Sequence, residues 1–476
     1  RVSMSKIYIF GIGGTGSRVI KSLTMLLASG VQMDSDAIVP IIIDPDVAAA
    51  DLTRTVDLIH TFNNIRGKLT FTTDTQCDFF RTEIRELLPG FRMNLENTQN
   101  LRFKEYIQLS TMDRANQAFA KILFSDDNLN SDMEVGFKGN PNIGSVVLNR
   151  FTQSVQFLDF ASDFQGGDKI FIISSIFGGT GASGFPVLLK NLRTLLQKDS
   201  QFPNGKEIQD CVIGAISVLP YFGVKPKDES AIDQATFISK TKAALTYYNQ
   251  NMSTIDLLYY LADDIKNKYE NNEGGENQKN DAHLMELAAA LAIVDLDKSI
   301  KERSPQTIYR EFGVKSNSEN LTLPDLCDMT YDTIAKPLTQ FTLFCKFINE
   351  QLSDSIRQKL PWTVRFNEKK WFADRYVKSY INRFVAEYVT WLTEMQNNKR
   401  GFAPFELGEN RNAVFSLVKG CETKKVLFRV DSNYALFDGY LNKKEKKFKE
   451  GLSLEQRFME LFYTVTEELI NDKIRL

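Results

Sequence analysis

Short, uninterrupted apolar runs recur through the first half of the chain. Residues 7–10, 37–43 and 169–177 each have the length of a strand and almost no polar positions. Strands covered by helices on both faces show such runs, whereas half-exposed strands alternate. The first run leads into an apolar helical pattern and then into the second run. The sequence therefore predicts a β–loop–α–β unit and an α/β fold class.

Glycine-rich turns follow two of these predicted strands directly and open the helices after them. The first turn reads "GIGGTG" and starts at Gly11, and the second reads "GGTGASG" and starts at Gly178. Such a turn presents backbone N–H groups at the positive end of a helix dipole, which suits a phosphate. One turn alone also fits a dinucleotide site or an adenylating enzyme, and such glycines also serve close helix packing. Two turns favour the longer phosphate chain of a nucleoside triphosphate.

The later sequence is richer in helical patterns. Residues 269–280 predict a polar loop, and 281–300, with alanine and leucine at helical density, predict a central helix. Segments 80–88 and 114–123 predict helices added within an insertion at about 50–135. Past residue 330, aromatic and aliphatic residues at helical spacing predict core helices, while 413–418 and 424–430 predict two short strands. The organisation expected is a nucleotide-binding domain (4–265), the loop and central helix (266–300) and a divergent C-terminal domain (301–476).

Composition narrows the functions that fit. The 58 basic and 60 acidic residues are mixed along the chain, giving a net charge of −2, so neither nucleic acid nor an anionic membrane is an expected partner. The five scattered cysteines indicate a reducing cytoplasm rather than a disulfide framework. Only His60 and His283 are present, which excludes a histidine-rich metal centre and leaves little room for a Ser-His-Asp triad. The lysines of 443–449 form either a solvated helix face or a contact for an acidic protein surface.

Taken in order, the motifs resemble those of the tubulin and FtsZ superfamily. "GGTGASG" is similar to its glycine signature and "FGIGGTGSRVI" to its first nucleotide loop. "IIIDPD" is similar to the second loop, "GFKGNPNIGSVV" to the third, and "ISVLPYFGV" to the strand and Pro-Tyr that open the fifth. The matches cover roughly the first 290 residues. The chain resembles a divergent, bacterial member of the superfamily.

This resemblance implies a Rossmann-like parallel sheet, a long central helix, a divergent and mostly helical α+β C-terminal domain, and a site for GTP or GDP with Mg²⁺. Asp46 would lie near the γ-phosphate and the metal. Asn280, Asp281 or His283 would face the base, although Asn280 is equally well explained as a helix N-cap. The residues implied to contact the phosphates and the sugar are Gly11, Gly13, Gly14, Thr15, Gly16, Asp44, Asp46, Gly139, Asn140, Pro141, Gly144, Gly178, Gly179, Thr180 and Gly181.

In the family, hydrolysis is completed by an acid from a neighbouring subunit. The closest match here is Asp325, with Glu286 as the second candidate; Thr322 replaces the family's middle acid. Capping explains an Asp that follows a proline equally well. The family's ribose-binding glutamate is replaced by Leu219.

Three functions stay open at this stage. The first is a self-assembling, filament-forming GTPase with head-to-tail contacts. The second is a non-polymerising, nucleotide-gated regulator in a bacterial conflict or defence system, with protein partners on its C-terminal domain. The third is a Rossmann-type or adenylating nucleotide enzyme.

Overall fold

A computed structural model gives the fold. It describes residues 4–46, 49–94, 101–133, 141–149, 152, 154–224, 234–263, 267–269, 280–316, 318–408, 410–424, 433–448 and 450–476. Within these ranges, no helix combines the length and the apolar character that crossing a membrane requires. The predicted sites Gly139 and Asn140 lie outside the described residues.

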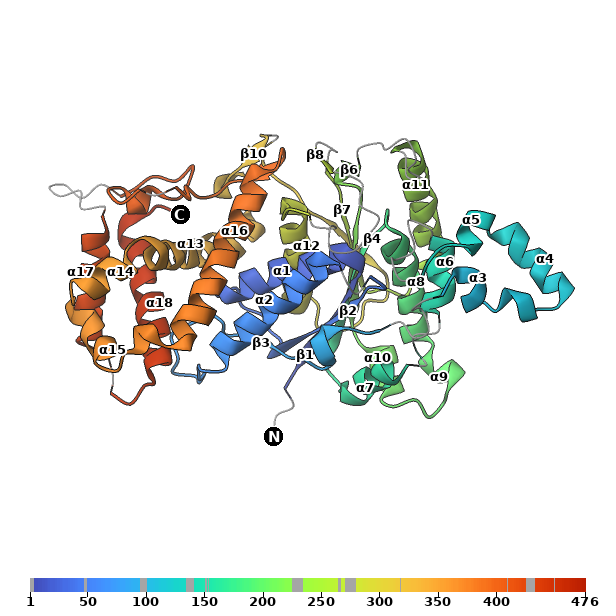
Figure 1. Ribbon diagram of the computed structural model, residues 1–476, viewed down its shortest axis with the longest axis horizontal. Helices are drawn as coiled ribbons and strands as arrows, with labels where there is room; N and C mark the ends of the chain where they lie inside the picture. Colours follow the sequence, from blue (N-terminus) through green and yellow to red (C-terminus); the bar gives the residue numbers. More distant parts are fainter. Residues whose placement is uncertain are drawn as a thin grey trace.

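Seven parallel strands form the central sheet, in the order β3-β2-β1-β4-β5-β7-β9 (Figure 1). The two predicted strand–glycine–helix units supply its middle, where β1 pairs with β4. The Rossmann-like α/β class is therefore confirmed. The strands are β1 (Lys6–Ile12), β2 (Ala37–Ile43), β3 (Glu83–Ile84), β4 (Lys169–Ser175), β5 (Ile213–Val218), β7 (Leu257–Leu261) and β9 (Ile308–Glu311).

Helices cover both faces of the sheet, which explains the unbroken apolar runs. In β1, Ile7 and Ile9 face one core, and Tyr8 and Phe10 face the other. The first core is completed by α1 (Gly13–Ala28), α2 (Ala50–Arg66) and α12 (Leu284–Ser299). The second is completed by α6 (Pro141–Leu148), α7 (Val155–Asp163), α8 (Gly179–Arg193), α10 (Gly205–Asp210) and α11 (Gln234–Asn251).

The predicted central helix is α12. It is apolar around most of its circumference, as expected of a helix buried on several sides. It packs on α1 and lies so close to β5 that a Cβ added at Gly214 would be 2.8 Å from Leu296. Its N-cap is His283, so the interpretation of Asn280 as the N-cap was wrong.

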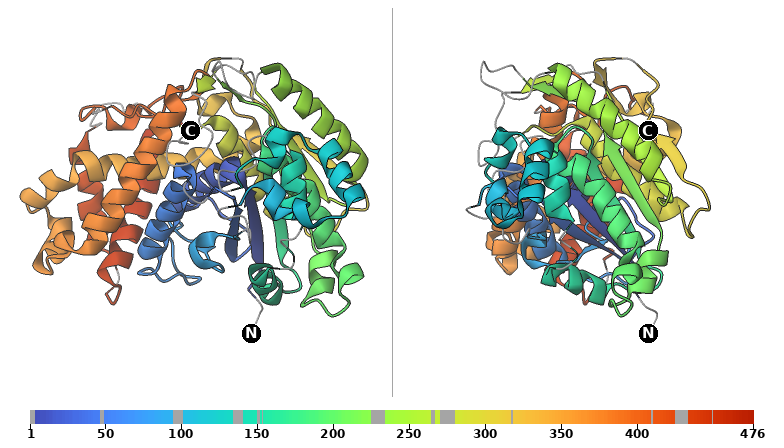
Figure 2. Two further views of the ribbon diagram at one scale, coloured as in Figure 1. Left: turned by 45° about the vertical axis from the view of Figure 1, so that its right-hand side comes forward. Right: turned by 90° about the vertical axis from the view of Figure 1, so that its right-hand side faces the viewer.

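The insertion between β3 and α6 forms a small helical projection at one end of the molecule (Figures 1 and 2). It contains α3 (Phe103–Tyr106), α4 (Arg114–Leu123) and α5 (Asp126–Leu129), so the helix predicted at 114–123 is confirmed. The helix predicted at 80–88 was wrong. Phe80 has a φ of 58°, and the chain then runs extended as β3, where Ile84 pairs with Ile38 of β2.

The C-terminal part is mostly helical, as expected, and is built on an aromatic core around Phe347, Trp362 and Phe462. The strand predicted at 413–418 was wrong: consecutive side chains such as Val414 and Phe415 are both buried, in a 3-10 turn rather than a strand. Most of 424–430 lies outside the described residues. The helices are α13 (Asp328–Glu350), α14 (Leu352–Arg357), α15 (Val364–Glu368), the π-helix η7 (Tyr376–Ile381), α16 (Asn382–Asn397), α17 (Tyr434–Glu445) and α18 (Leu454–Lys473).

Shorter elements connect these layers. They are α9 (Leu195–Lys198), the strand pairs β6 (Phe222–Val224) with β8 (Asn267–Tyr269) and β10 (Asn320–Leu321) with β11 (Gly401–Phe402), and the 3-10 turns η1 (Pro89–Phe91), η2 (Leu109–Thr111), η4 (Leu323–Asp325), η5 (Pro361–Thr363), η6 (Trp371–Ala373) and η8 (Val414–Ser416). The C-terminal helices share the core of α1 and α2: Trp391 Nε1 of α16 donates to Ser22 Oγ of α1 at 3.2 Å.

Candidate functional site

The strand order reverses between β1 and β4. From β1 the chain proceeds outward through β2 and β3, whereas from β4 it proceeds the other way through β5, β7 and β9. The helices that follow these two strands, α1 and α8, lie on opposite faces of the sheet. In open parallel sheets, ligands bind beyond the carboxyl ends of the strands at such a switch point. Both glycine turns lie there.

The two turns are in contact. Gly13 adopts a φ of +70°, which favours glycine, and a Cβ at that position would be 3.8 Å from Thr180 Cβ of the second turn. Two motifs more than 160 residues apart in the chain therefore meet at the switch point between β1 and β4. Gly11 and Gly16 also have a packing role, since a Cβ at Gly16 would be 2.4 Å from the carbonyl carbon of Gly11. Those two glycines allow α1 to approach β1.

Neither helix at the switch point is capped by a side chain. The N-cap of α1 is Ile12 and that of α8 is Gly178, and neither makes a side-chain cap hydrogen bond. By contrast, α12 has a capping box of His283 and Glu286. First-turn N–H groups of α1 and α8, at the positive ends of two helix dipoles, therefore meet at one edge of the sheet without a cap of their own. Such groups fit the oxygens of a phosphate chain.

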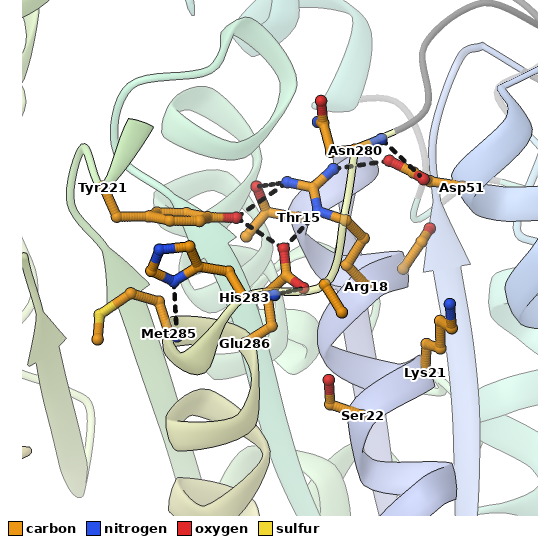
Figure 3. Close-up of polar contacts among 12 residues, drawn as sticks. Thr15, Arg18, Lys21, Ser22, Asp51, Tyr221, Asn280, His283, Met285 and Glu286 are labelled. Carbon is orange, nitrogen blue, oxygen red and sulfur yellow. Dashed lines mark hydrogen bonds and ion pairs between the residues drawn. The ribbon is translucent and has the colours of Figure 1, made fainter. Parts of the chain in front are cut away.

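Behind the first turn, Arg18 organises a buried polar cluster (Figure 3). Its Nε donates to Glu286 Oε1 of α12 at 2.6 Å, and its Nη1 donates to Asp51 Oδ2 of α2 at 2.9 Å. Its Nη2 donates to Tyr221, which follows β5, at 3.1 Å, and to Thr15 at 3.3 Å. One side chain thus joins the glycine turn to three other elements.

The charges in this cluster are mutually dependent. Burial raises the pKa of Glu286, an effect that Arg18 opposes. Burial by itself would lower the pKa of Arg18, but Tyr221, Glu286 and Asp51 together raise it well above its usual value. Arg18 therefore stays cationic, and its charge is balanced by groups from distant parts of the chain.

Both predicted catalytic acids accept hydrogen bonds within the chain. Glu286 Oε1 accepts from Arg18 and from Tyr221 at 2.9 Å, and Oε2 accepts from the backbone N–H of His283 at 3.1 Å. Asp325 lies in η4, beside the C-terminal helices, and its Oδ2 accepts from both the N–H and the hydroxyl of Thr322 at 2.7 Å. The structure does not bring these two acids together.

The predicted residues after β2 form a compact turn at the edge of the sheet. The backbone N–H of Asp46 donates to Asp44 Oδ1 at 3.0 Å. Burial, with a smaller contribution from the Asp46 charge, raises the pKa of Asp44 to about 7. Among the described residues, no group of three or more His, Cys, Asp or Glu side chains is arranged to hold a metal ion. Asp46 as a metal ligand stays a prediction.

The remaining predicted residues lie at the starts of two helices. Pro141 and Gly144 belong to α6, which packs on α8. The backbone N–H of Asn280 donates to Asp51 Oδ1 at 3.4 Å, which places the approach to α12 beside the Arg18 cluster. Arg18, Asp51 and Tyr221 were not among the predicted site residues. The one sequence signal for Arg18 is a cation that follows the glycine turn, in a helix whose only other charged residue is Lys21.

His283 supplies a pH-dependent prediction. Burial, together with the charges of Arg18 and Arg400, lowers its pKa to about 4, so the folded chain keeps it neutral, with Nδ1 accepting from the N–H of Met285 at 3.1 Å. The unfolded chain takes up a proton below about pH 6.5, so stability is lost as the pH falls toward 4. His283→Asn, which keeps a capping oxygen, should reduce this loss by up to about 1.4 kcal/mol per pH unit.

Urea unfolding between pH 4.5 and 7.5 checks this expectation, because this range starts just above the folded pKa of about 4 and ends about one unit above the unfolded value. His60→Asn is the matched control, because the His60 side chain is 44% exposed and lies 3.3 Å from Glu86 Oε2. Equal pH slopes for wild type and His283→Asn would count against the neutral, buried histidine.

The sheet and the paired turns define a Rossmann-like α/β protein with two uncapped helix N-termini at its switch point. No protein-family model matches the sequence, and no curated protein matches it. Among solved structures, the chain is similar to CetZ proteins of the tubulin and FtsZ family, with 14% identity in each case.

CetZ from Methanosaeta thermophila strain DSM 6194 has a TM-score of 0.32, over 62% of this chain and 56% of that one. CetZ2 from Haloferax volcanii, a GTPγS-bound protofilament, has a TM-score of 0.30 over 62% and 60%. CetZ1 from the same organism, a GDP-bound monomer, has 0.28 over 54% and 51%. The chain thus spans between half and three fifths of each of these proteins. At TM-scores this low, the similarity does not assign roles to individual residues.

Proposed function

We propose that the chain is a tubulin/FtsZ-like nucleotide-binding protein that holds GTP or GDP, with Mg²⁺, at the switch point between β1 and β4. The contact between the two glycine turns carries this proposal, with Gly13 beside Thr180. Two uncapped helices supply N–H donors from opposite faces of the sheet to one phosphate chain. Thr15 and Thr180 add hydroxyl groups to these turns. A dinucleotide enzyme usually commits one such turn to its pyrophosphate.

The proposal assigns different residues to the different parts of the nucleotide. The turns at Gly13–Gly14 and Gly178–Gly179 bind the phosphates, Asp44 and Asp46 face the sugar or the metal, and the segment from Asn280 to His283 lies toward the base. Arg18 is a positioning residue, because it holds the first turn against α12 and α2. The bound nucleotide supplies the phosphoanhydride that any hydrolysis would cleave.

Identification of the bound nucleotide tests the proposal. Protein purified without added nucleotide is denatured, and the released compounds are separated by ion-exchange chromatography. The nucleotide-free protein is then heated with GTP, ATP or NAD. We expect GTP to raise the melting temperature by several degrees through preferential binding to the folded state. Protection by NAD alone, or by ATP alone, would assign the site to another class of enzyme.

Head-to-tail self-association with slow hydrolysis is the function that we favour. The specific alternative is a nucleotide-gated regulator that does not polymerise, with protein partners on its C-terminal helices. This alternative is supported by the surroundings of Asp325. Its carboxylate accepts hydrogen bonds from Thr322, and Thr322 itself stands where the family has a further acid. Light scattering and electron microscopy with GTP and with GDP distinguish the two, since only the first predicts GTP-dependent filaments.

Asp325→Asn tests whether Asp325 is the catalytic acid of GTP hydrolysis. Asparagine keeps an oxygen for the Thr322 N–H but removes the charge that would orient a water molecule, so we expect unchanged nucleotide affinity and at least a tenfold slower hydrolysis. Phosphate release at saturating GTP measures the effect. Glu319→Gln, an exposed acid on the same segment, is the control. An unchanged rate in Asp325→Asn would exclude Asp325 as the catalytic acid.

A further inference from the structure

Helix α4 carries its apolar side outward. Phe119, Ile122 and Leu123 are 60%, 80% and 51% exposed, and Ala115 and Ala118 beside them are also exposed. At 100° per residue these five side chains occupy one continuous arc of about 140°. They stand at the i, i+3, i+4, i+7 and i+8 positions that a helix normally turns toward a core.

The opposite side of α4 packs against the rest of the insertion. Ala120 and Phe124 are buried, and the Phe124 ring packs edge-on against Phe103 of α3, with ring centroids 4.8 Å apart. The N-terminus is capped by Asp113, whose Oδ1 accepts from the N–H groups of Ala115 and Asn116 at 2.9 Å. The helix that carries the exposed arc is therefore held by α3 on its opposite side and by the Asp113 cap at its N-terminus.

The charges around α4 differ between its two ends. Arg114 begins the helix and is exposed, whereas Asp126 and Asp127, also exposed, follow directly after its end in the first turn of α5. The whole insertion from 101 to 133 contains four basic residues (Arg102, Lys104, Arg114, Lys121) and five acidic ones (Glu105, Asp113, Asp126, Asp127, Asp132). Its net charge of −1 does not suit an anionic membrane surface, which attracts basic segments.

We propose that α4 is a contact surface for a second copy of this chain, with the two α4 helices packed antiparallel about a twofold axis. An antiparallel pair places the apolar arcs face to face. It also places Arg114 of each copy beside Asp126 and Asp127 of the other, so the charges at the two ends are complementary. The insertion projects from the body of the molecule (Figures 1 and 2), which leaves room for a second copy to approach.

The contact is small. Five side chains cover much less than the roughly 800 Å² per partner of a standard interface, so the dimer is a weak one, with a dissociation constant in the range of about 10 µM to 1 mM. This contact is distinct from head-to-tail assembly. It does not use the switch point, and it forms without nucleotide.

Sedimentation equilibrium of nucleotide-free protein, from about 10 µM to 1 mM, tests the proposal. We expect reversible dimerisation by the wild type and at least a tenfold weaker association for the double variant Phe119→Asp/Ile122→Asp. Both positions are exposed, so the fold is retained, which circular dichroism checks. The matched control is Val155→Asp, on α7, where Val155 is 66% exposed.

A charge exchange tests the antiparallel arrangement. Arg114→Glu should weaken the dimer, and Arg114→Glu combined with Asp126→Lys and Asp127→Lys should restore it. A wild type that stays monomeric, a dimer unaffected by Phe119→Asp/Ile122→Asp, or an exchange that fails to restore association would each overturn the proposal. Sedimentation with vesicles of phosphatidylserine and phosphatidylcholine, in the absence of self-association, would assign α4 to a membrane surface instead. Loss of nucleotide binding affects none of these outcomes.

Discussion

Arg18→Met is expected to lower the free energy of unfolding by about 3–5 kcal/mol, because it removes the cation closest to two buried carboxylates and leaves Asp51 with the more distant Arg54, at 3.8 Å. Glu286 and Asp51 are both nearly inaccessible to solvent, and each lies within 3 Å of the guanidinium group. Arg18→Lys should recover only part of this loss, since a single ammonium group cannot direct donors to α2, α12 and Tyr221 at once. Urea unfolding at pH 7 in nucleotide-free buffer measures the difference.

The control for this experiment is an exposed ion pair that joins α16 to α2. Arg383 pairs with Asp57 at 3.2 Å, and both side chains are 53% exposed, so Arg383→Met should cost no more than about 1 kcal/mol. The combination Arg18→Met with Glu286→Gln should be less damaging than the sum of its parts, because Gln removes one of the unpaired charges. If Arg18→Met cost as little as Arg383→Met, the cluster could not hold the glycine turn in place.

Gly14→Asp is expected to lower nucleotide affinity by at least 100-fold without unfolding the protein. A Cβ at Gly14 has space, since its nearest neighbour is Arg18 Nη1 at 3.4 Å, and an acid in the first turn of a helix is favourable for stability. The same carboxylate stands where the proposal puts phosphate, so it repels the ligand. Isothermal titration with GTP, with the melting temperature of the free protein measured alongside, gives both quantities.

Gly14→Asn and Gly14→Ala are the matched controls, as they add volume without charge and should retain affinity within about tenfold. Gly181→Asp is a poorer test. A Cβ at Gly181 would be 2.6 Å from the carbonyl oxygen of Ser175, so loss of binding there would follow from damage to the packing of α8 on β4. Normal GTP affinity in Gly14→Asp would refute the assignment of the first turn to the phosphates.

The sheet was predictable because its signals are local. Strands such as β1 and β4 are buried on both faces, so they read as apolar runs, and the glycines after them mark the turns. The failures occurred where tertiary contacts override the local pattern. Residues 80–88 have a helical distribution of apolar positions, but the open edge of β2 offers hydrogen bonds, and the N–H of Arg85 donates to Ile38 at 2.9 Å.

The candidate site was predictable in part for the same reason. The glycine turns are contiguous in sequence, whereas the Arg18 cluster is assembled from residues 33, 203 and 268 positions away along the chain. The sequence around Asp51 and the sequence around Tyr221 contain no signal that either residue contacts Arg18. That the two turns touch likewise depends on the pairing of β1 with β4, which no single motif encodes.

Helix α1 is a rod about 24 Å long with one end at the first glycine turn. Fifteen of its 16 residues are buried, and Ser22 in its middle is held by Trp391 of the C-terminal helices. A tightly packed rod cannot absorb a displacement by bending. Any tilt of α1 at the glycine turn would therefore be passed on to the C-terminal helices that pack against it.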